Sequence, residues 1–74
     1  MESEELAAKL KDMYFNSSEG ESALSIHLFG IKYASEINAC GVSPTNIAKL
    51  AGVPETYGVE INKGRNLSKY VVLK

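Results

Sequence analysis

Apolar residues recur at three- and four-residue spacing in several stretches of the chain, which is the spacing of one face of an α-helix. The first such stretch is predicted to run from about Glu4 to Phe15, with Ser3 as its N-terminal cap. Its core-facing residues are expected to be Leu6, Ala7, Leu10, Met13 and Tyr14. A Ser/Gly/Glu segment of loop composition follows. We therefore expect the chain to begin with a helix that covers the core.

Residues 23–29 fit two patterns. Ile26 and Leu28 alternate with polar neighbours as in a half-buried strand, but residues 24–34 also fit the spacing of a helix. The end of the chain, KYVVLK, carries adjacent β-branched valines and is typical of a short strand. If residues 23–29 are a strand, the two segments are expected to pair as a short two-stranded wing.

Glycines divide the predicted helices. The apolar spacing of residues 30–38 predicts a helix that ends at Gly41, and a further short helix is expected to end at Gly52. We interpret Gly30, like these two, as a helix-end glycine, and Gly64 as a left-handed cap near the end of the chain.

The stretch from Ser43 to Lys63, SPTNIAKLAGVPETYGVEINK, organises the rest of the chain. After the turn at Gly52, a second helix is predicted to start at once, because Pro54 suits a first helical turn and Glu55 suits the positive end of a helix dipole. Val53, Tyr57 and Ile61 recur at four-residue spacing and define its buried face. The pattern therefore predicts two short helices joined by a tight turn.

This stretch resembles the helix-turn-helix of bacterial DNA-binding proteins. In that family a small residue lies in the first helix, a glycine follows four residues later in the turn, and an aliphatic residue comes next. Ala48, Gly52 and Val53 occupy those places. Gly58 departs from the family, which normally has Ile or Val there, and a mid-helix glycine costs about 1 kcal/mol relative to alanine. The glycine either counts against the helix-turn-helix assignment or marks a place where the backbone approaches something closely.

A wider resemblance covers Ile26 to Ile37, IHLFGIKYASEI, and Ile61 to Leu73, INKGRNLSKYVVL. These runs look like small helix-turn-helix-like proteins associated with bacterial restriction and defence genes. The resemblance implies no defined activity.

Composition and charge set further limits. The 74 residues are enough for one domain, 1–74, with one small core, and homodimerisation is a plausible way to bury more apolar surface. Residues 1–26 hold six acids and two lysines, whereas residues 27–74 hold six cations and three acids. The net charge of −1 argues against binding nucleic acid by bulk charge, but the basic part contains the helix-turn-helix pattern.

Candidate chemistry is sparse. Cys40 is the only cysteine, so no intrachain disulfide can form, and a reducing, cytoplasmic location is expected. His27 is the only histidine and lacks companions for a metal site or a catalytic pair. The acidic first ten residues predict no signal peptide, and no apolar run comes near the roughly 20 residues that span a bilayer. We expect no enzyme activity, no cofactor, no metal and no membrane partner.

The predicted partner is double-stranded DNA, with the second helix in the major groove. Cations would contact phosphates and other side chains would approach base edges. We place Lys63, Arg65 and Lys69 on a loop or wing beside that helix. Glu60 lies in the middle of the helix, where it would repel phosphates or accept a hydrogen bond from a cytosine amino group. The full predicted set is Lys49, Thr56, Tyr57, Val59, Glu60, Lys63, Arg65 and Lys69.

Two functions remain open from the sequence. The first is a small regulatory or accessory DNA-binding module. The second is an adaptor domain of the same fold that binds a protein partner instead of DNA, which the acids Glu55 and Glu60 and the unusual Gly58 favour. In both, the predicted fold is a mostly α bundle of about four helices, with its motif at residues 43–63.

Overall fold

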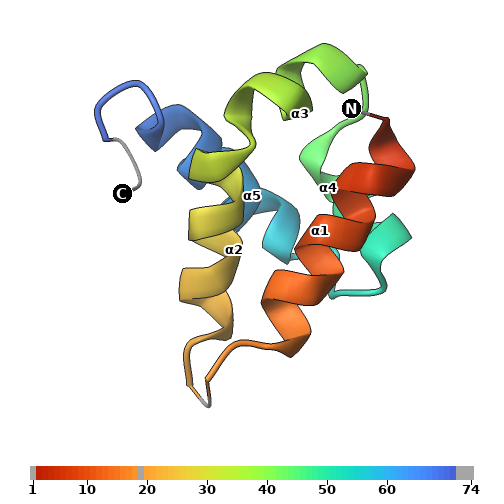
Figure 1. The fold of residues 1–74 in the computed structure, drawn as a ribbon, viewed down its shortest axis with the longest axis vertical. Helices are drawn as coiled ribbons and strands as arrows, with labels where there is room; N and C mark the ends of the chain where they lie inside the picture. Colours follow the sequence, from red (N-terminus) through yellow and green to blue (C-terminus); the bar gives the residue numbers. More distant parts are fainter. Residues whose placement is uncertain (1, 19, 72–74) are drawn as a thin grey trace.

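The computed structural model describes residues 2–18 and 20–71, and in this part of the chain it contains five helices and no strand (Figure 1). The helices are α1 (Ser3–Phe15), α2 (Ser22–Lys32), α3 (Ala34–Cys40), α4 (Pro44–Ala51) and α5 (Tyr57–Leu67). The prediction of a small, mostly helical bundle is confirmed. The described part has one helix more than expected.

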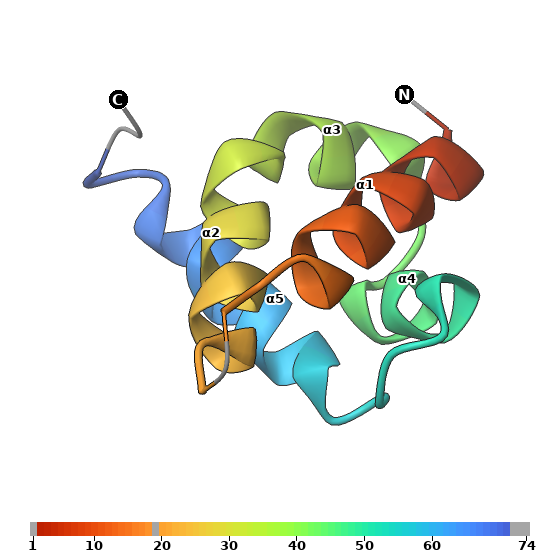
Figure 2. The same cartoon turned by 60° about the horizontal axis from the view of Figure 1, so that its bottom comes forward.

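The helices form two layers. Helices α1 and α2 lie side by side as an antiparallel pair, with α4 packed against α1, and α5 packed against α2 and α4 (Figures 1 and 2). Helix α3 crosses one end of the bundle and contacts α1, α2 and α5. This arrangement holds both helices of the predicted helix-turn-helix, α4 and α5, against the N-terminal pair.

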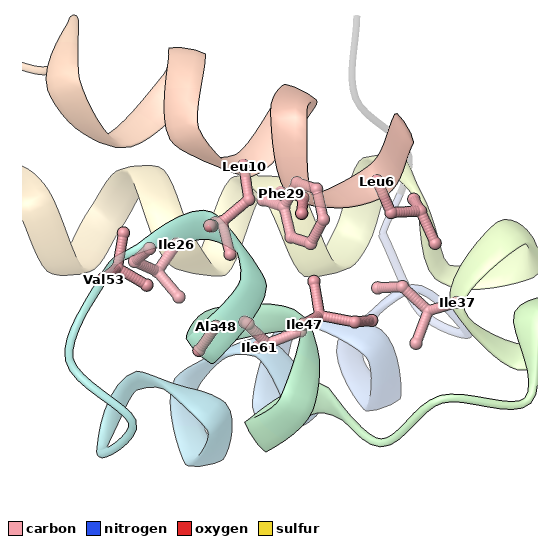
Figure 3. Close-up of a cluster of buried hydrophobic side chains, with 11 residues drawn as sticks. Leu6, Leu10, Ile26, Phe29, Ile37, Ile47, Ala48, Val53 and Ile61 are labelled. Carbon is pink, nitrogen blue, oxygen red and sulfur yellow. The ribbon is translucent and has the colours of Figure 1, made fainter. Parts of the chain in front are cut away.

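Every helix contributes to one apolar core (Figure 3). Its largest fully buried side chains are Phe29, Leu6, Leu10, Ile26, Ile37, Ile47 and Ile61. No polar or charged residue of the described part is buried. Burial of a large aliphatic or aromatic side chain is worth about 1.5–3 kcal/mol, so these residues account for most of the attraction between helices.

The N-terminal helix lies where the sequence predicts it, with one difference. Glu2 occupies the cap position and Ser3 is the first helical residue, where its hydroxyl donates to the Glu4 carboxylate at 3.3 Å instead of capping the helix. The predicted core residues Leu6, Ala7 and Leu10 are buried. Met13 and Tyr14 are partly buried and pack at the edge of the core.

Residues 23–29 are helical, so the strand alternative for them is wrong. As part of α2 they bury Ile26 and Phe29 on one face, which a strand of alternating residues would not do. The single helix predicted for residues 30–38 is instead divided at Tyr33, whose φ of −111° and ψ of 22° separate α2 from α3. This bend turns α3 across the end of the bundle, where Ile37 closes the core.

The predicted wing is therefore not supported. The first of its two strands is helix, and residues 69–71 continue from α5 as a turn without strand pairing. The remainder of the predicted C-terminal strand, residues 72–74, lies outside the described residues.

The glycines have two different roles. Gly41 and Gly52 end α3 and α4 with φ of +73° and +77°, as predicted for helix-end glycines. Gly30 and Gly64 instead lie inside α2 and α5, so their assignment as helix ends is wrong. A Cβ atom on Gly30 would lie 2.4 Å from the Ile61 carbonyl oxygen, and one on Gly64 would lie 2.3 Å from the His27 carbonyl oxygen. The two glycines let the backbones of α2 and α5 touch.

Candidate nucleic-acid interface

Helix α4 and its turn follow local signals in the sequence. The Ser43 hydroxyl accepts a hydrogen bond from the Asn46 backbone N–H at 3.3 Å, and Pro44 occupies the first helical turn. At the other end, Gly52 adopts the left-handed conformation, and the Val53 N–H donates to the Ala48 carbonyl at 3.1 Å. The Ala48–Gly52–Val53 turn predicted from the resemblance is confirmed.

The second helix begins later than predicted. Residues 54–56 form a turn in which the Pro54 carbonyl accepts from the Tyr57 N–H at 3.0 Å, and α5 starts at Tyr57. Glu55 therefore does not stabilise a helix dipole from the first turn. Its carboxylate pairs with Lys49 Nζ at 2.9 Å, with both side chains exposed.

Gly58 marks a close approach between the two helices. It is buried in the first turn of α5, and a Cβ atom there would lie 2.6 Å from Thr45 Oγ1 and 2.8 Å from Thr45 Cα. An Ile or Val side chain would not fit in this position. The departure from the helix-turn-helix pattern at Gly58 is thus explained by the contact of α5 with the start of α4.

One side of α5 faces away from the bundle. Val59 is 60% exposed, Lys63 follows it one turn later, and Asn66, Leu67 and Tyr70 continue the same surface toward the end of the chain. Lys63, Asn66, Leu67 and Tyr70 line a shallow hollow. We call this surface, from Val59 to Tyr70, the outer face of α5. It combines a cation, an amide and three apolar side chains.

Glu60 does not project freely from α5. Its carboxylate is hydrogen-bonded to His27 Nε2 of α2, and its other oxygen lies 3.4 Å from Lys63 Nζ. The hydrogen bond with His27 is the main cause of a lowered pKa at Glu60, with Lys63 adding to the effect against partial desolvation. A hydrogen bond from cytosine to Glu60 would compete with these two contacts, so the structure gives no support to a contact of Glu60 with base edges.

Arg65 lies within α5, not on a loop or wing. Its guanidinium donates to the Asn62 side chain one turn earlier and to Asn38 Oδ1 of α3 at 3.3 Å. Lys63 also lies within α5, and only Lys69 follows the helix, in an exposed turn. The three cations are therefore not gathered on one loop.

The remaining predicted residues fall into two groups. Thr56 and Val59 are exposed, Thr56 directly before α5 and Val59 within its first turn. Tyr57 is half-buried and its ring packs against that of Tyr14, with centroids 5.6 Å apart, so it mainly serves the contact between α5 and α1. The sequence placed Tyr57 both on the buried face of this helix and among the candidate DNA-binding residues.

Two polar residues of α5 were not predicted from the sequence. Asn66 lies beside Lys63 on the outer face, and Asn62 holds the Arg65 guanidinium. The signal that could have found Asn66 is its position three residues after Lys63, which places both on one side of a helix. The contact between His27 and Glu60 had no such local signal, because these residues are 33 positions apart.

The described residues contain neither a cluster of metal-ligating side chains nor a membrane-spanning helix. Among residues 2–18 and 20–71, no group of three or more His, Cys, Asp or Glu side chains is placed to hold a metal ion. Cys40 is half-buried, and its thiol donates to the Ile37 carbonyl at 3.2 Å. None of the described helices has the length and apolar character needed to cross a membrane.

Comparison with known families agrees with this geometry. A family model described as an HTH-like domain matches residues 2–74. The chain belongs to the HTH-like domain family. The match includes α1, α2 and α3 as well as the helix-turn-helix itself, so the similarity is not confined to the motif. No curated protein and no solved structure matches the chain, and the comparisons do not show an association with restriction or defence genes.

Proposed function

We propose that this HTH-like domain is a small regulatory or accessory module that binds double-stranded DNA through the outer face of α5. The observation that carries the proposal is the combination of the α4–Gly52–α5 turn with an α5 surface left uncovered by the rest of the bundle. In helix-turn-helix proteins the second helix enters the major groove, where its side chains reach base edges. The proposal is one of binding and assigns no catalytic residue. The single Cys40 favours a cytoplasmic setting.

The charges of the motif favour contact with phosphates, although modestly. Residues 44–71 hold four cations and two carboxylates. Lys69 is exposed beyond the end of α5, and Lys63 is 60% exposed despite its contact with Glu60. Lys49 is paired with Glu55 on the surface, where such pairs are worth at most about 1 kcal/mol and exchange readily for a phosphate. We assign Lys49, Lys63 and Lys69 to backbone contacts, and Thr56, Val59 and Asn66 to the base edges.

A specific observation favours a second candidate, the adaptor domain. Val59, Leu67 and Tyr70 are large apolar side chains exposed on the outer face of α5, and Tyr70 is 83% exposed. Tyrosine is enriched among the residues that contribute most to protein interfaces, and contiguous exposed apolar side chains often mark such sites. An adaptor would use the same outer face of α5 to bind a protein partner.

Fluorescence anisotropy with labelled random duplex DNA at two salt concentrations separates the two candidates. For DNA binding we expect affinity to fall steeply with salt, and Lys63→Ala to reduce the slope of log K against log [salt] by about one unit. Lys9→Ala, which removes an exposed cation from α1, is the matched control and should leave the slope unchanged. An absence of binding at low salt by the folded protein would reject the DNA proposal and favour the adaptor.

A further inference from the structure

A second surface, formed by α1 and α4, lies outside the candidate interface. It is a shallow hollow of about 240 Å³ lined by Glu4, Ala7, Ala8, Lys11, Leu50 and Ala51. Ala7 and Ala51 are nearly buried and form its floor, whereas Leu50 at its rim is 55% exposed. The hollow therefore has an apolar floor and an apolar rim residue next to two charged side chains, Glu4 and Lys11.

The charges around this hollow are self-complementary. Glu4 and Lys11 are seven residues apart on α1, so they lie on the same side of the helix about 10 Å apart along its axis. Neither forms an ion pair with any residue that the structure describes. If a second α1 lies antiparallel across the hollow, with the two-fold axis between Ala7 and Ala8, each Glu4 meets the Lys11 of the other copy.

We propose that this surface is an interface between two copies of the chain. A two-fold axis makes both partners use the same patch, as most soluble homo-oligomers do. The small side chains of Ala7 and Ala8 allow the two α1 helices to approach closely, and Leu50 of each copy covers the alanines of the other. The occupant of each hollow is therefore the α1–α4 surface of a second copy.

A dimer through this surface would cover a small part of the molecule. The chain exposes 4596 Å², and a contact at the small end of specific interfaces, about 600 Å² per copy, would cover roughly an eighth of it. The lining residues come only from α1 and α4, so the outer face of α5 stays uncovered. The dimer interface does not depend on whether α5 binds DNA or protein.

Charge reversal tests the proposed pairing. Glu4→Lys alone would bring two lysine side chains together in a homodimer, and Lys11→Glu alone would bring two glutamates together. We expect each single variant to dimerise about tenfold more weakly than the wild type, because two favourable pairs become repulsive. In a mixture of the two variants both cross-pairs again join opposite charges, so it should form heterodimers more tightly than either variant forms homodimers.

Sedimentation equilibrium from micromolar to millimolar protein provides the measurement. Glu5→Lys and Lys9→Glu change the same charges on α1 outside the hollow and are the matched controls, with circular dichroism to verify folding. Leu50→Glu should abolish the dimer in a folded protein. A wild-type monomer at all concentrations would overturn the proposal. So would a dimer that these reversals do not weaken, or single variants that mixing does not rescue.

Discussion

The contact between His27 and Glu60 shows that a single side chain can change the charge that α5 exposes at the candidate interface. Glu60 is engaged by α2 on one side and by Lys63 on the other, so it fixes a lysine of the outer face next to the bundle. A carboxylate that looks repulsive to DNA in the sequence therefore has a structural role. Its two partners reduce the negative charge that α5 presents to solvent.

This contact makes a prediction about acid stability. The hydrogen bond with His27 holds the pKa of Glu60 below its ordinary value of 4.5, so folding favours the ionised carboxylate. The stabilisation is fully present above the ordinary pKa and is lost as pH falls through the lower pKa of the folded state. We expect the free energy of unfolding to decline as pH falls below about 5, and to decline less in Glu60→Gln.

Urea unfolding monitored by circular dichroism across this pH range measures the difference. Glu36→Gln removes a carboxyl from α3 outside the contact with His27 and is the control for loss of a negative charge. If Glu60→Gln and the wild type lose stability in parallel as pH falls, the carboxylate of Glu60 does not stabilise the fold.

At the scale of helices, the crossing of α2 and α5 is the tightest contact described above. Gly30 and Gly64 face each other, and a Cβ atom on Gly64 would lie 3.1 Å from Gly30 Cα as well as 2.3 Å from the His27 carbonyl oxygen. Both neighbours are backbone atoms, which cannot move aside as the end of a flexible side chain can. The position of α5 on α2 therefore depends on the absence of a side chain at both glycine positions.

Replacement of Gly64 by alanine should consequently destabilise the protein. An alanine in an exposed helix position would stabilise by about 1 kcal/mol relative to glycine. Here the clash with α2 reverses the sign, and we expect a loss of about 1–3 kcal/mol in the free energy of unfolding. Thermal and urea unfolding give the value. Asn66→Ala, on the exposed side of the same helix, should change stability by no more than about 0.5 kcal/mol. A stabilised Gly64→Ala variant would contradict the close crossing.

The same scale shows what the sequence could predict. The turn after α4 was predicted correctly because its signal is local: Gly52 ends the helix in the left-handed conformation. The second helix was placed at Pro54, whereas α5 begins at Tyr57. Residues 23–29 could not be assigned, because strand and helix spacing fit equally over so short a run. The predicted wing was not supported for the same reason, because one of its two strands was residues 23–29. Gly30 and Gly64 were misassigned because only a contact between distant helices explains them, and local sequence carries no sign of it.

At the scale of the whole molecule, the candidate site is less predictable than the fold. Exposure of Thr56, Val59 and Lys63 follows from helix periodicity once α5 is positioned. Arg65 bonds a residue of α3, and Glu60 bonds a residue of α2. These partners depend on how α3 and α2 pack against α5, which cannot be predicted from the periodicity of α5 alone. The role of each predicted residue toward DNA stays a prediction.

The small core makes the molecule sensitive to single substitutions. For 74 residues a typical free energy of unfolding is about 4–11 kcal/mol. The two phenylalanines provide a matched pair, since Phe29 is fully buried and Phe15 is 61% exposed. Phe29→Ala should cost about 3–5 kcal/mol and leave a large unfolded population. Phe15→Ala should cost no more than about 1 kcal/mol, the value of its edge contact with Tyr14.

Amide NMR spectra and urea unfolding of the two variants, at concentrations where the wild type is monomeric, measure both effects. We expect a well-dispersed spectrum for Phe15→Ala and a poorly dispersed spectrum, typical of an unfolded chain, for Phe29→Ala. Equal losses of stability in the two variants would contradict the core shown in Figure 3.

The meeting of Gly30 and Gly64 also has a kinetic consequence. Helix α4 and its turn are stabilised by contacts between residues close in sequence, so they can form early in folding. In contrast, the chain between α2 and α5 must close a loop of roughly 30 residues before their backbones touch. The loop has to close with both glycines aligned, since a side chain at either position would hold the helices apart. The speed of folding is therefore expected to depend on this one closure more than on how fast the individual helices form.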